Sequence, residues 1–245
     1  MNTTPDAIDE GSGLNGHAAV IVMIKAPRAG DVKTRLCPYL TPTEAAELAS
    51  CFAVDAVIAA IGTGAIVLIA YAPTDGREVL EPLLPDGVEW IPQRGDTLGE
   101  RMYEAIEEAG SRGYRPVAVI GADSPTLPSG LLQRAFALLS TNGADAVFGP
   151  TEDGGYYLIG VRQAEAGLFD TVAWSTASAL ADTLRNAAYL GLRAKLLSTW
   201  YDIDTPDDLC RLRIELRTDS TARERAPRTY EWLLSHEDID NRPYA

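Results

Sequence analysis

A loop near the N-terminus gathers positive charge that could bind an anion. The segment K-A-P-R-A-G-D-V-K-T-R-L places Lys25, Arg28, Lys33 and Arg35 within eleven residues, in a chain with a formal net charge of −14 and three lysines in all. A lysine ammonium acts as a point charge and an arginine guanidinium as a two-pronged donor, and both suit phosphate oxygens. The cluster predicts an anion site; the alternative is a solvated basic loop that binds nothing.

The same loop lacks two familiar phosphate-binding signatures. Neither G-x-x-x-x-G-K-[ST] nor G-x-G-x-x-G follows the apolar run 17–24 that precedes it. The first signature is typical of P-loop nucleoside triphosphatases and the second of Rossmann dinucleotide-binding domains. We therefore expect a phosphate site of another class.

Three aspartates follow predicted strands and could hold a metal ion. Asp123 comes directly after the apolar run 116–121, and Asp202 and Asp204 lie in Y-D-I-D-T-P. Side chains alternate in extended segments, so Asp202 and Asp204 project from one face. Carboxylates without histidine, of which the chain has two, are typical of Mg²⁺ or Mn²⁺ sites. The alternatives are an Asx turn for Asp123 and a helix cap for Asp204.

Glycine-bearing loops mark further candidate binding segments. G-P-T-E-D-G-G-Y-Y at 149–157 has adjacent glycines that allow positive φ or close approach of the backbone to a ligand. A plain hairpin turn is the alternative. Q-R-G-D-T-L-G-E-R-M at 93–102 could bind a base or phosphate or simply connect two elements, and W-S-T at 174–176 could cap a helix.

Alternating apolar and amphipathic segments must position these residues. Thr41-Pro42 and Thr205-Pro206 carry cap signals that open helices. Alternation of strands and helices predicts an α/β layered fold with a mainly parallel sheet, whose ligands bind beyond the carboxyl ends of the strands. The expected strands are 17–24, 65–71, 88–91, 116–121, 144–149, 156–161 and 193–197, and the expected helices are 41–60, 77–84, 98–111, 129–140, 176–190, 205–217 and 223–235.

Composition narrows the classes of partner. A pI near 4.5 argues against a basic surface that coats nucleic acid or a membrane. The apolar runs are far shorter than the roughly 20 residues that cross a bilayer. Three widely spaced cysteines indicate reduced thiols, hence a cytoplasmic protein.

The chain is expected to form one main domain. Residues 1–16 are rich in small polar residues and read as a flexible tail. Residues 17–217 form the predicted domain, and 218–245 a peripheral C-terminal helix and tail.

Taken in order, these segments resemble one family. The sequence is similar to bacterial GT-A-like predicted glycosyltransferases, which are related to 2-phospholactate guanylyltransferase and molybdenum-cofactor guanylyltransferase. The resemblance covers about residues 20–212 and rests on K-A-P-R-A-G-D-V-K-T-R-L, Q-R-G-D-T-L-G-E-R-M, G-A-D-S-P-T-L, G-P-T-E-D-G-G-Y-Y-L-I-G, W-S-T and Y-D-I-D-T-P-D-D-L. It implies a three-layer nucleotide-diphospho-sugar-transferase (GT-A-like) fold with a mainly parallel central sheet.

The resemblance also implies roles for individual residues. Lys33 and Arg35 would face the nucleotide phosphates beside Lys25 and, with Asp123, carry catalysis. The divalent ion, Mg²⁺ or Mn²⁺, would be held by the three aspartates named above. Positions implied for base and acceptor binding are Leu98 and Gly99 for the base, and Asp153, Gly154, Gly155 and Ser175 for the acceptor.

The implied activity is a Mg²⁺-dependent nucleotidyl transfer. An NTP would be joined to a small phosphorylated or carboxylated acceptor with release of pyrophosphate. Glycosyl transfer from a nucleotide-diphospho-sugar donor is the alternative on the same fold, with Asp153 or Glu152 as the base. A nucleotide-binding sensor without catalysis is the third class. The partners are thus small molecules, with no nucleic acid and no membrane span, and a homo-oligomer is left open.

Overall fold

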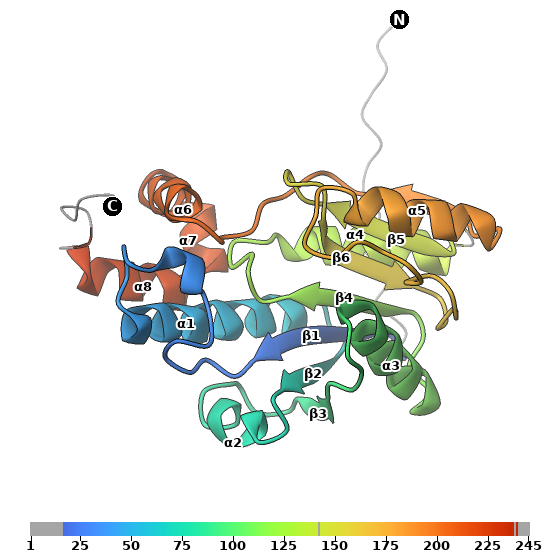
Figure 1. The fold of residues 1–245 in the computed structure, drawn as a ribbon, viewed down its shortest axis with the longest axis horizontal. Helices are drawn as coiled ribbons and strands as arrows, with labels where there is room; N and C mark the ends of the chain where they lie inside the picture. Colours follow the sequence, from blue (N-terminus) through green and yellow to red (C-terminus); the bar gives the residue numbers. More distant parts are fainter. Residues whose placement is uncertain (1–16, 142, 238, 240–245) are drawn as a thin grey trace, which may run out of the picture.

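The computed structural model describes residues 17–141, 143–237 and 239. The tail expected at residues 1–16 lies outside the described residues. A single seven-stranded sheet runs through the described chain, with helices on both faces (Figure 1). This three-layer arrangement confirms the predicted fold class.

The sheet is mostly parallel, with one reversed strand. β1 pairs in parallel with β2 and β4, whereas β6 runs antiparallel to both β4 and β5. β5 and β6 are consecutive and join through residues 151–155, so this glycine-bearing segment is a hairpin connection. The strands in sheet order are β3 (Glu89–Pro92), β2 (Ile66–Ala72), β1 (Ala19–Lys25), β4 (Val117–Gly121), β6 (Tyr156–Val161), β5 (Ala146–Pro150) and β7 (Ala194–Leu196).

Threonine caps fix where three of the helices begin. Thr41, Thr97 and Thr205 each accept a hydrogen bond from the backbone N–H three residues on, in reciprocal capping boxes. Two of these three helices also begin with proline. The helices are α1 (Pro42–Ile61), α2 (Gly76–Leu80), α3 (Leu98–Ser111), α4 (Ser129–Ser140), α5 (Ala179–Tyr189), α6 (Pro206–Thr218), α7 (Ser220–Arg225) and α8 (Pro227–Ser235), with the short 3₁₀ helix η1 (Thr34–Leu36).

Two apolar cores hold the helices against the sheet. One joins α1, α2 and α4 to one face of the strands, and the other joins α3 and α5 to the opposite face. Successive side chains of β1 alternate between these cores, as Val20 and Ile21 show. Burial on both faces explains why the strands are apolar throughout.

A third core joins η1 and α1 to the C-terminal helices. Leu36, Leu209 and Trp232 are buried in it. The single helix expected at 223–235 is two helices, because Asp219 caps α7 and Pro227 opens α8. The buried Asp55 of α1 accepts hydrogen bonds from Thr229, which ties α8 down.

Two expectations drawn from composition concern membrane-spanning helices and the state of the cysteines. Within the described ranges, no helix combines the length and the apolar character that crossing a membrane requires. Cys37, Cys51 and Cys210 are free thiols.

Candidate active site

Lys33 lies at the centre of the site because of how its loop turns. Its φ of 49° is in the left-handed region, which is uncommon for a residue with a side chain. This turn begins η1, and Leu36 at the end of η1 is fully buried in the third core. The anchored turn directs the lysine side chain inward rather than into solvent.

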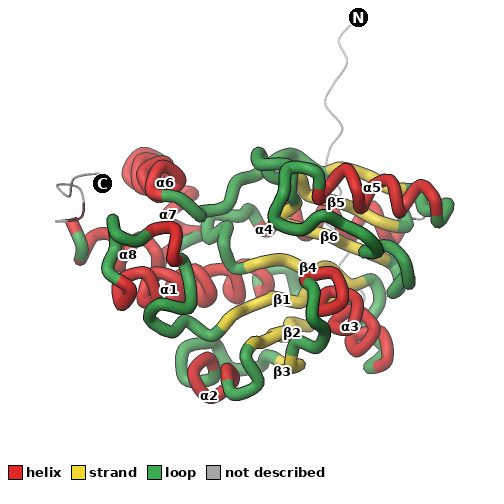
Figure 2. The backbone as a smooth tube through the Cα atoms, viewed as in Figure 1, coloured by secondary structure: helices red, strands yellow, loops and turns green. Residues whose placement is uncertain are grey.

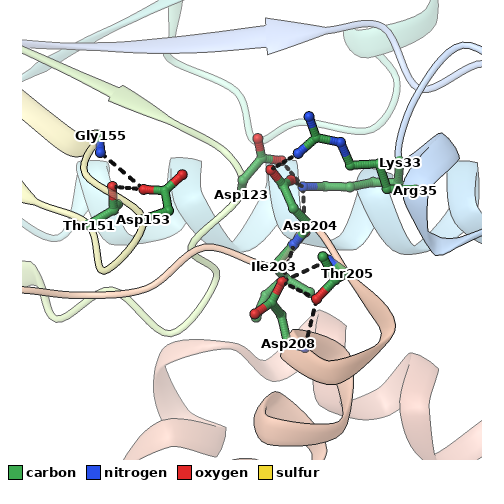
Figure 3. A network of polar contacts seen from close by, with 10 residues as sticks. All are labelled: Lys33, Arg35, Asp123, Thr151, Asp153, Gly155, Ile203, Asp204, Thr205 and Asp208. Carbon is green, nitrogen blue, oxygen red and sulfur yellow. Dashed lines mark hydrogen bonds and ion pairs between the residues drawn. The ribbon is translucent and has the colours of Figure 1, made fainter. Parts of the chain in front are cut away.

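The Lys33 ammonium joins two strand-end loops that are far apart in the sequence. Its Nζ lies 2.6 Å from Asp123 Oδ1 and 3.0 Å from Asp204 Oδ1. It also donates to the backbone carbonyl of Ile203 at 2.6 Å (Figure 3). The Lys33 side chain is only 7% exposed, while those of Asp123 and Asp204 are 54% and 38% exposed. The lysine is therefore a buried cation held by two carboxylates that still face solvent.

Opposing effects act on this ammonium, and the carboxylates prevail. Burial alone would lower the pKa of Lys33, since it disfavours the charged form. The negative charges of Asp123 and Asp204 and their hydrogen bonds raise the pKa of Lys33 above its ordinary value. Lys33 therefore stays protonated and positively charged at neutral pH.

Backbone contacts hold the two acidic loops together. The N–H of Ile203 donates to the carbonyl of Asp123 at 2.9 Å. The hydroxyl of Ser124 donates to the carbonyl of Tyr201, also at 2.9 Å. These bonds bring the segment after β4 beside the segment before α6, so the backbone holds Asp123 close to Asp204.

Asp202 lies in the same electrostatic neighbourhood and is half-buried. Burial, together with the negative charges of Asp204 and Asp153, raises the pKa of the Asp202 carboxyl to about 6. Ionising Asp202 adds another negative charge to a region that already holds Asp123 and Asp204. The three aspartates named for a metal ion therefore lie within electrostatic reach of one another.

The cationic loop lines a cavity of about 290 Å³ with the acidic residues. Lys25, Lys33, Arg35, Asp123 and Asp204 all contribute to its walls. The Arg35 side chain is 70% exposed and its Nη1 lies 3.6 Å from Asp204 Oδ2. This guanidinium is free to meet a ligand while staying beside the carboxylates.

The two remaining cations of the loop have other partners. Lys25 Nζ donates to the backbone carbonyl of Asp31 at 2.8 Å. Arg28 forms an ion pair with Asp75 at 2.7 Å and does not line the cavity. The basic cluster therefore divides into Lys25, Lys33 and Arg35 around the cavity and Arg28 outside it.

The residues expected near an acceptor form a second group beside the aspartates. Asp153 Oδ1 accepts hydrogen bonds from Thr151 Oγ1 at 2.5 Å and from the N–H of Gly155 at 3.1 Å. Gly154 has a φ of +90°, and a Cβ there would lie 2.2 Å from the carbonyl oxygen of Ala177. Only glycine fits this contact, which packs the 151–155 hairpin against the segment that carries Ser175.

The residues expected near a base lie apart from the cavity around Lys33. Gly99 is buried at the start of α3, where a Cβ would lie 2.8 Å from Phe169 and 2.9 Å from Trp174. Leu98 is 45% exposed. Neither residue lines the cavity around Lys33, and Gly99 instead lines a second cavity beside α3.

Fit to a divalent ion can be judged from the donors themselves. Asp123 and Asp204 converge on one cation, the Lys33 ammonium, and their oxygens are of the type that Mg²⁺ and Mn²⁺ prefer. Among the described residues no group of three or more Asp, Glu, His or Cys stands ready to enclose an ion. The carboxylates thus fit a divalent ion in kind, but Asp202 does not complete a group of three with Asp123 and Asp204, and Lys33 occupies the point on which those two converge.

Some contacts of the site escape sequence reasoning. Thr151, which fixes Asp153, and the Ile203 carbonyl, which receives Lys33, both come from segments that the motifs include. The Thr-x-Asp spacing is a signal for the first, because short polar side chains bond locally in turns. No sequence signal identifies a backbone carbonyl as a ligand of a distant lysine.

Comparison with known proteins gives the relatives of this chain. A family model described as "Uncharacterized protein conserved in bacteria (DUF2064)" matches residues 56–176. A 2-phospho-L-lactate guanylyltransferase from Archaeoglobus fulgidus is 30% identical over 188 residues, which are 76% of this chain and 79% of that protein.

Solved structures agree with these relatives. A protein from Desulfovibrio desulfuricans G20, assigned as a nucleotide-diphospho-sugar transferase, aligns with a TM-score of 0.83 and 31% identity over 93% of this chain and 98% of its own. The 4-diphosphocytidyl-2C-methyl-D-erythritol synthase of Anaerococcus prevotii shares the fold, with a TM-score of 0.56 and 9% identity over 83% of this chain and 98% of its own.

Fold and relatives together define the class as a transferase built on the nucleotide-diphospho-sugar-transferase fold. The chain belongs to the family of bacterial proteins related to 2-phospho-L-lactate guanylyltransferase. This membership confirms the resemblance found in the sequence motifs and supports an enzyme that is a transferase.

The raised pKa of Asp202 leads to a pH-dependent prediction. Because the folded state holds the Asp202 proton more tightly than the unfolded state, its ionisation lowers stability as the pH rises from about 4 through about 6. Asp202→Asn should raise the melting temperature by about 2–4 °C at pH 7.5, which is about 1 kcal/mol after allowing for solvent screening. At pH 4.5 the carboxyl is mostly protonated and the gain should nearly vanish.

Thermal unfolding in EDTA at both pH values measures this difference. Asp31→Asn is the control, since Asp31 lines the cavity around Lys33 and is exposed, whereas Asp202 is half-buried and does not line that cavity. An equal rise in melting temperature for Asp202→Asn at both pH values would contradict the interpretation that ionisation of Asp202 destabilises the fold.

Proposed function

We propose that this transferase is a divalent-metal-dependent nucleotidyltransferase that joins an NTP to a small phosphorylated or carboxylated acceptor. The observation that carries the proposal is the cavity in which Lys33 and Arg35 meet Asp123 and Asp204. Cations suit the phosphates of a nucleotide, and adjacent carboxylates suit the metal that accompanies them. The guanylyltransferase relative supports the same class of reaction.

The chain's own residues have distinct parts in this reaction. The Lys33 ammonium would exchange its carboxylate partners for the nucleotide phosphates. Both kinds of partner are anionic, and the carboxylates already face solvent, where a nucleotide would enter. Arg35, already beside Asp204 and largely exposed, offers a planar pair of donors to the same phosphates. Together these two cations would stabilise the charge that develops on departing pyrophosphate.

Asp123, Asp202 and Asp204 would hold the divalent ion, Mg²⁺ or Mn²⁺. Such an ion supplies charge neutralisation and alignment of phosphate oxygens when it is bound. The aspartates can accept it once Lys33 turns to the phosphates, since they would then face one another without a counter-ion. Metal and nucleotide would thus bind together more readily than either binds alone.

The bond changes need no dedicated base. An oxygen of the acceptor's phosphate or carboxylate attacks the α-phosphorus, the bond from that phosphorus to the bridging oxygen breaks, and pyrophosphate leaves with the electron pair. The attacking group is already an anion at neutral pH, so positioning and electrostatics carry the catalysis. Asp153, Gly154, Gly155 and Ser175 would position the acceptor, and Leu98 and Gly99 the base.

The contacts of the hairpin favour this reaction over glycosyl transfer. An inverting glycosyltransferase would need a base at the acceptor hydroxyl, for which Asp153 and Glu152 are the candidates. Both oxygens of Glu152 pair with Arg211, at 2.7 and 3.0 Å, which lowers the pKa of this carboxyl and makes it a poor base. Asp153 is engaged by Thr151 and Gly155.

Cytoplasmic location and oligomeric state stay predictions.

Substrate panels test the proposed reaction directly. The protein is incubated with each NTP and Mg²⁺ in turn, together with small phosphorylated and carboxylated acceptors, and pyrophosphate release is measured. Nucleotide sugars run in parallel, with release of the nucleoside diphosphate as the readout. Pyrophosphate release that depends on both NTP and acceptor supports the proposal. Turnover of nucleotide sugars alone would overturn it.

Arg35 provides a matched pair of variants for the phosphate site. Arg35→Lys keeps the charge but removes the planar pair of donors. Because charge-assisted hydrogen bonds contribute about 1.5–3 kcal/mol, we expect kcat/KM to fall about tenfold to a hundredfold. Arg28→Lys should have little effect, since Arg28 is paired with Asp75 outside the cavity.

Steady-state kinetics on both variants measures the difference. Net charge is the same in the two proteins, so it cannot explain a gap between them. If Arg35→Lys and Arg28→Lys behave alike, Arg35 does not contact the phosphates.

A further inference from the structure

A second cavity lies on the α3 and α5 side of the sheet, apart from the site around Lys33. Its volume is about 370 Å³, and it lies between α3 and the segment 166–174. It shares no lining residue with the cavity that contains Lys33. In Figure 2 this segment is the loop that leads from β6 toward α5. None of the residues assigned to the phosphate and metal chemistry above contributes to it.

Aromatic rings form much of its wall. Tyr103 of α3 faces the cavity together with Phe169 and Trp174. The Phe169 and Trp174 rings are 6.3 Å apart between centroids and tilted by 42°. Buried Gly99 lets α3 approach the Trp174 ring and the Cβ of Phe169 closely, since a Cβ at residue 99 would lie 2.9 and 2.8 Å from them. The wall is therefore a fixed aromatic surface rather than a loose gap.

The backbone of the segment is strained where it borders the cavity. Thr171 has a φ of 53°, a conformation that β-branched residues rarely adopt. Strain of this kind costs of order 1–3 kcal/mol and persists where the surrounding structure enforces it, often at ligand sites. The packing around residues 166–174 therefore enforces a backbone conformation that Thr171 would not adopt by itself.

Every charged residue that lines the cavity is acidic. Glu100 and Asp170 carry the charge, and none of the described lining residues is Lys, Arg or His. Hydrogen bonds from the N–H groups of Asp96 and Thr97 lower the pKa of Glu100, which keeps it ionised. The neighbouring Arg101 is turned away, donating to the carbonyl of Gly95.

These features select the charge of a ligand. A phosphate or carboxylate would meet two carboxylates and no cation, so anions are disfavoured. An organic cation would gain from the carboxylates and from the negative faces of the aromatic rings, which attract ammonium groups. A neutral apolar group would gain only from burial of its surface.

We propose that the cavity between α3 and residues 166–174 is a binding site for a small organic ammonium group. Trp174 and Phe169 supply the aromatic contact and Asp170 the counter-charge at its exposed rim. The assignment goes beyond nucleotidyl transfer and shares one residue with it, because Gly99, proposed above for the base, also lines this cavity. Its test therefore measures ligand binding without nucleotide.

Titration with a matched pair of probes tests the proposal. Choline carries the cation, and 3,3-dimethylbutan-1-ol has the same shape without the charge. Binding is followed by tryptophan fluorescence and by calorimetry on the full chain without nucleotide. We expect choline to bind in the millimolar range and about fivefold to tenfold more tightly than the neutral probe, in line with cation–aromatic interactions.

Variants separate the site from a general charge effect. Asp170→Asn and Trp174→Leu should each abolish the preference for choline. Asp86→Asn removes an equal charge from an exposed loop position outside the cavity and should leave the preference intact. Thermal unfolding checks that all three remain folded.

Three results would overturn the assignment. Equal affinity for the two probes would mean that the cavity binds apolar groups without regard to charge. Absence of saturable choline binding would mean that it is no site for ammonium groups. Equal losses in Asp170→Asn and Asp86→Asn would attribute the preference to the overall negative charge of the protein.

Discussion

The contact of the Lys33 ammonium with Asp123, Asp204 and the Ile203 carbonyl is the constraint on which the site depends. A buried cation is costly unless it is paired and hydrogen-bonded, and these partners come from two loops distant in the sequence. The left-handed turn at Lys33 and the buried Leu36 keep the lysine inside. One ammonium therefore fixes the relative positions of the cationic loop and the acidic strand ends.

The same contact explains how a strongly acidic protein can present a site for phosphates. Lys33 is shared between protein carboxylates and, in the proposed reaction, nucleotide phosphates, while Arg35 remains exposed beside Asp204. Clustered carboxylates repel one another, and the charges of Asp204 and Asp153 add to the effect of burial in raising the pKa of Asp202. A cation must compensate them at every stage, and the chain supplies one itself. The second cavity, with its acidic and aromatic walls, has no such internal cation among its described lining residues.

Much of this arrangement follows from the sequence, but its closest contacts do not. Alternating apolar runs and the Thr-Pro caps locate the strands and helices, because burial and capping are local rules. Parallel strand ends bring Asp123 and Asp204 to one edge, as the order of elements predicts. That Asp204 turns to Lys33 instead of capping α6, which Thr205 caps, depends on tertiary packing. The separation of Gly99 from the cavity around Lys33 likewise depends on Phe169 and Trp174, seventy residues or more away.

Mn²⁺ affinity without nucleotide tests most directly whether Lys33 and a divalent ion share the same carboxylates. Calorimetry and electron paramagnetic resonance would compare wild type with Lys33→Met and with Lys25→Met, which removes the same charge from a lysine that donates to the backbone carbonyl of Asp31. The account predicts that Lys33→Met alone binds Mn²⁺ at least about tenfold more tightly, equivalent to about 1.4 kcal/mol, and that Mn²⁺ raises its melting temperature. Unchanged or weaker Mn²⁺ binding in a folded Lys33→Met variant would contradict it.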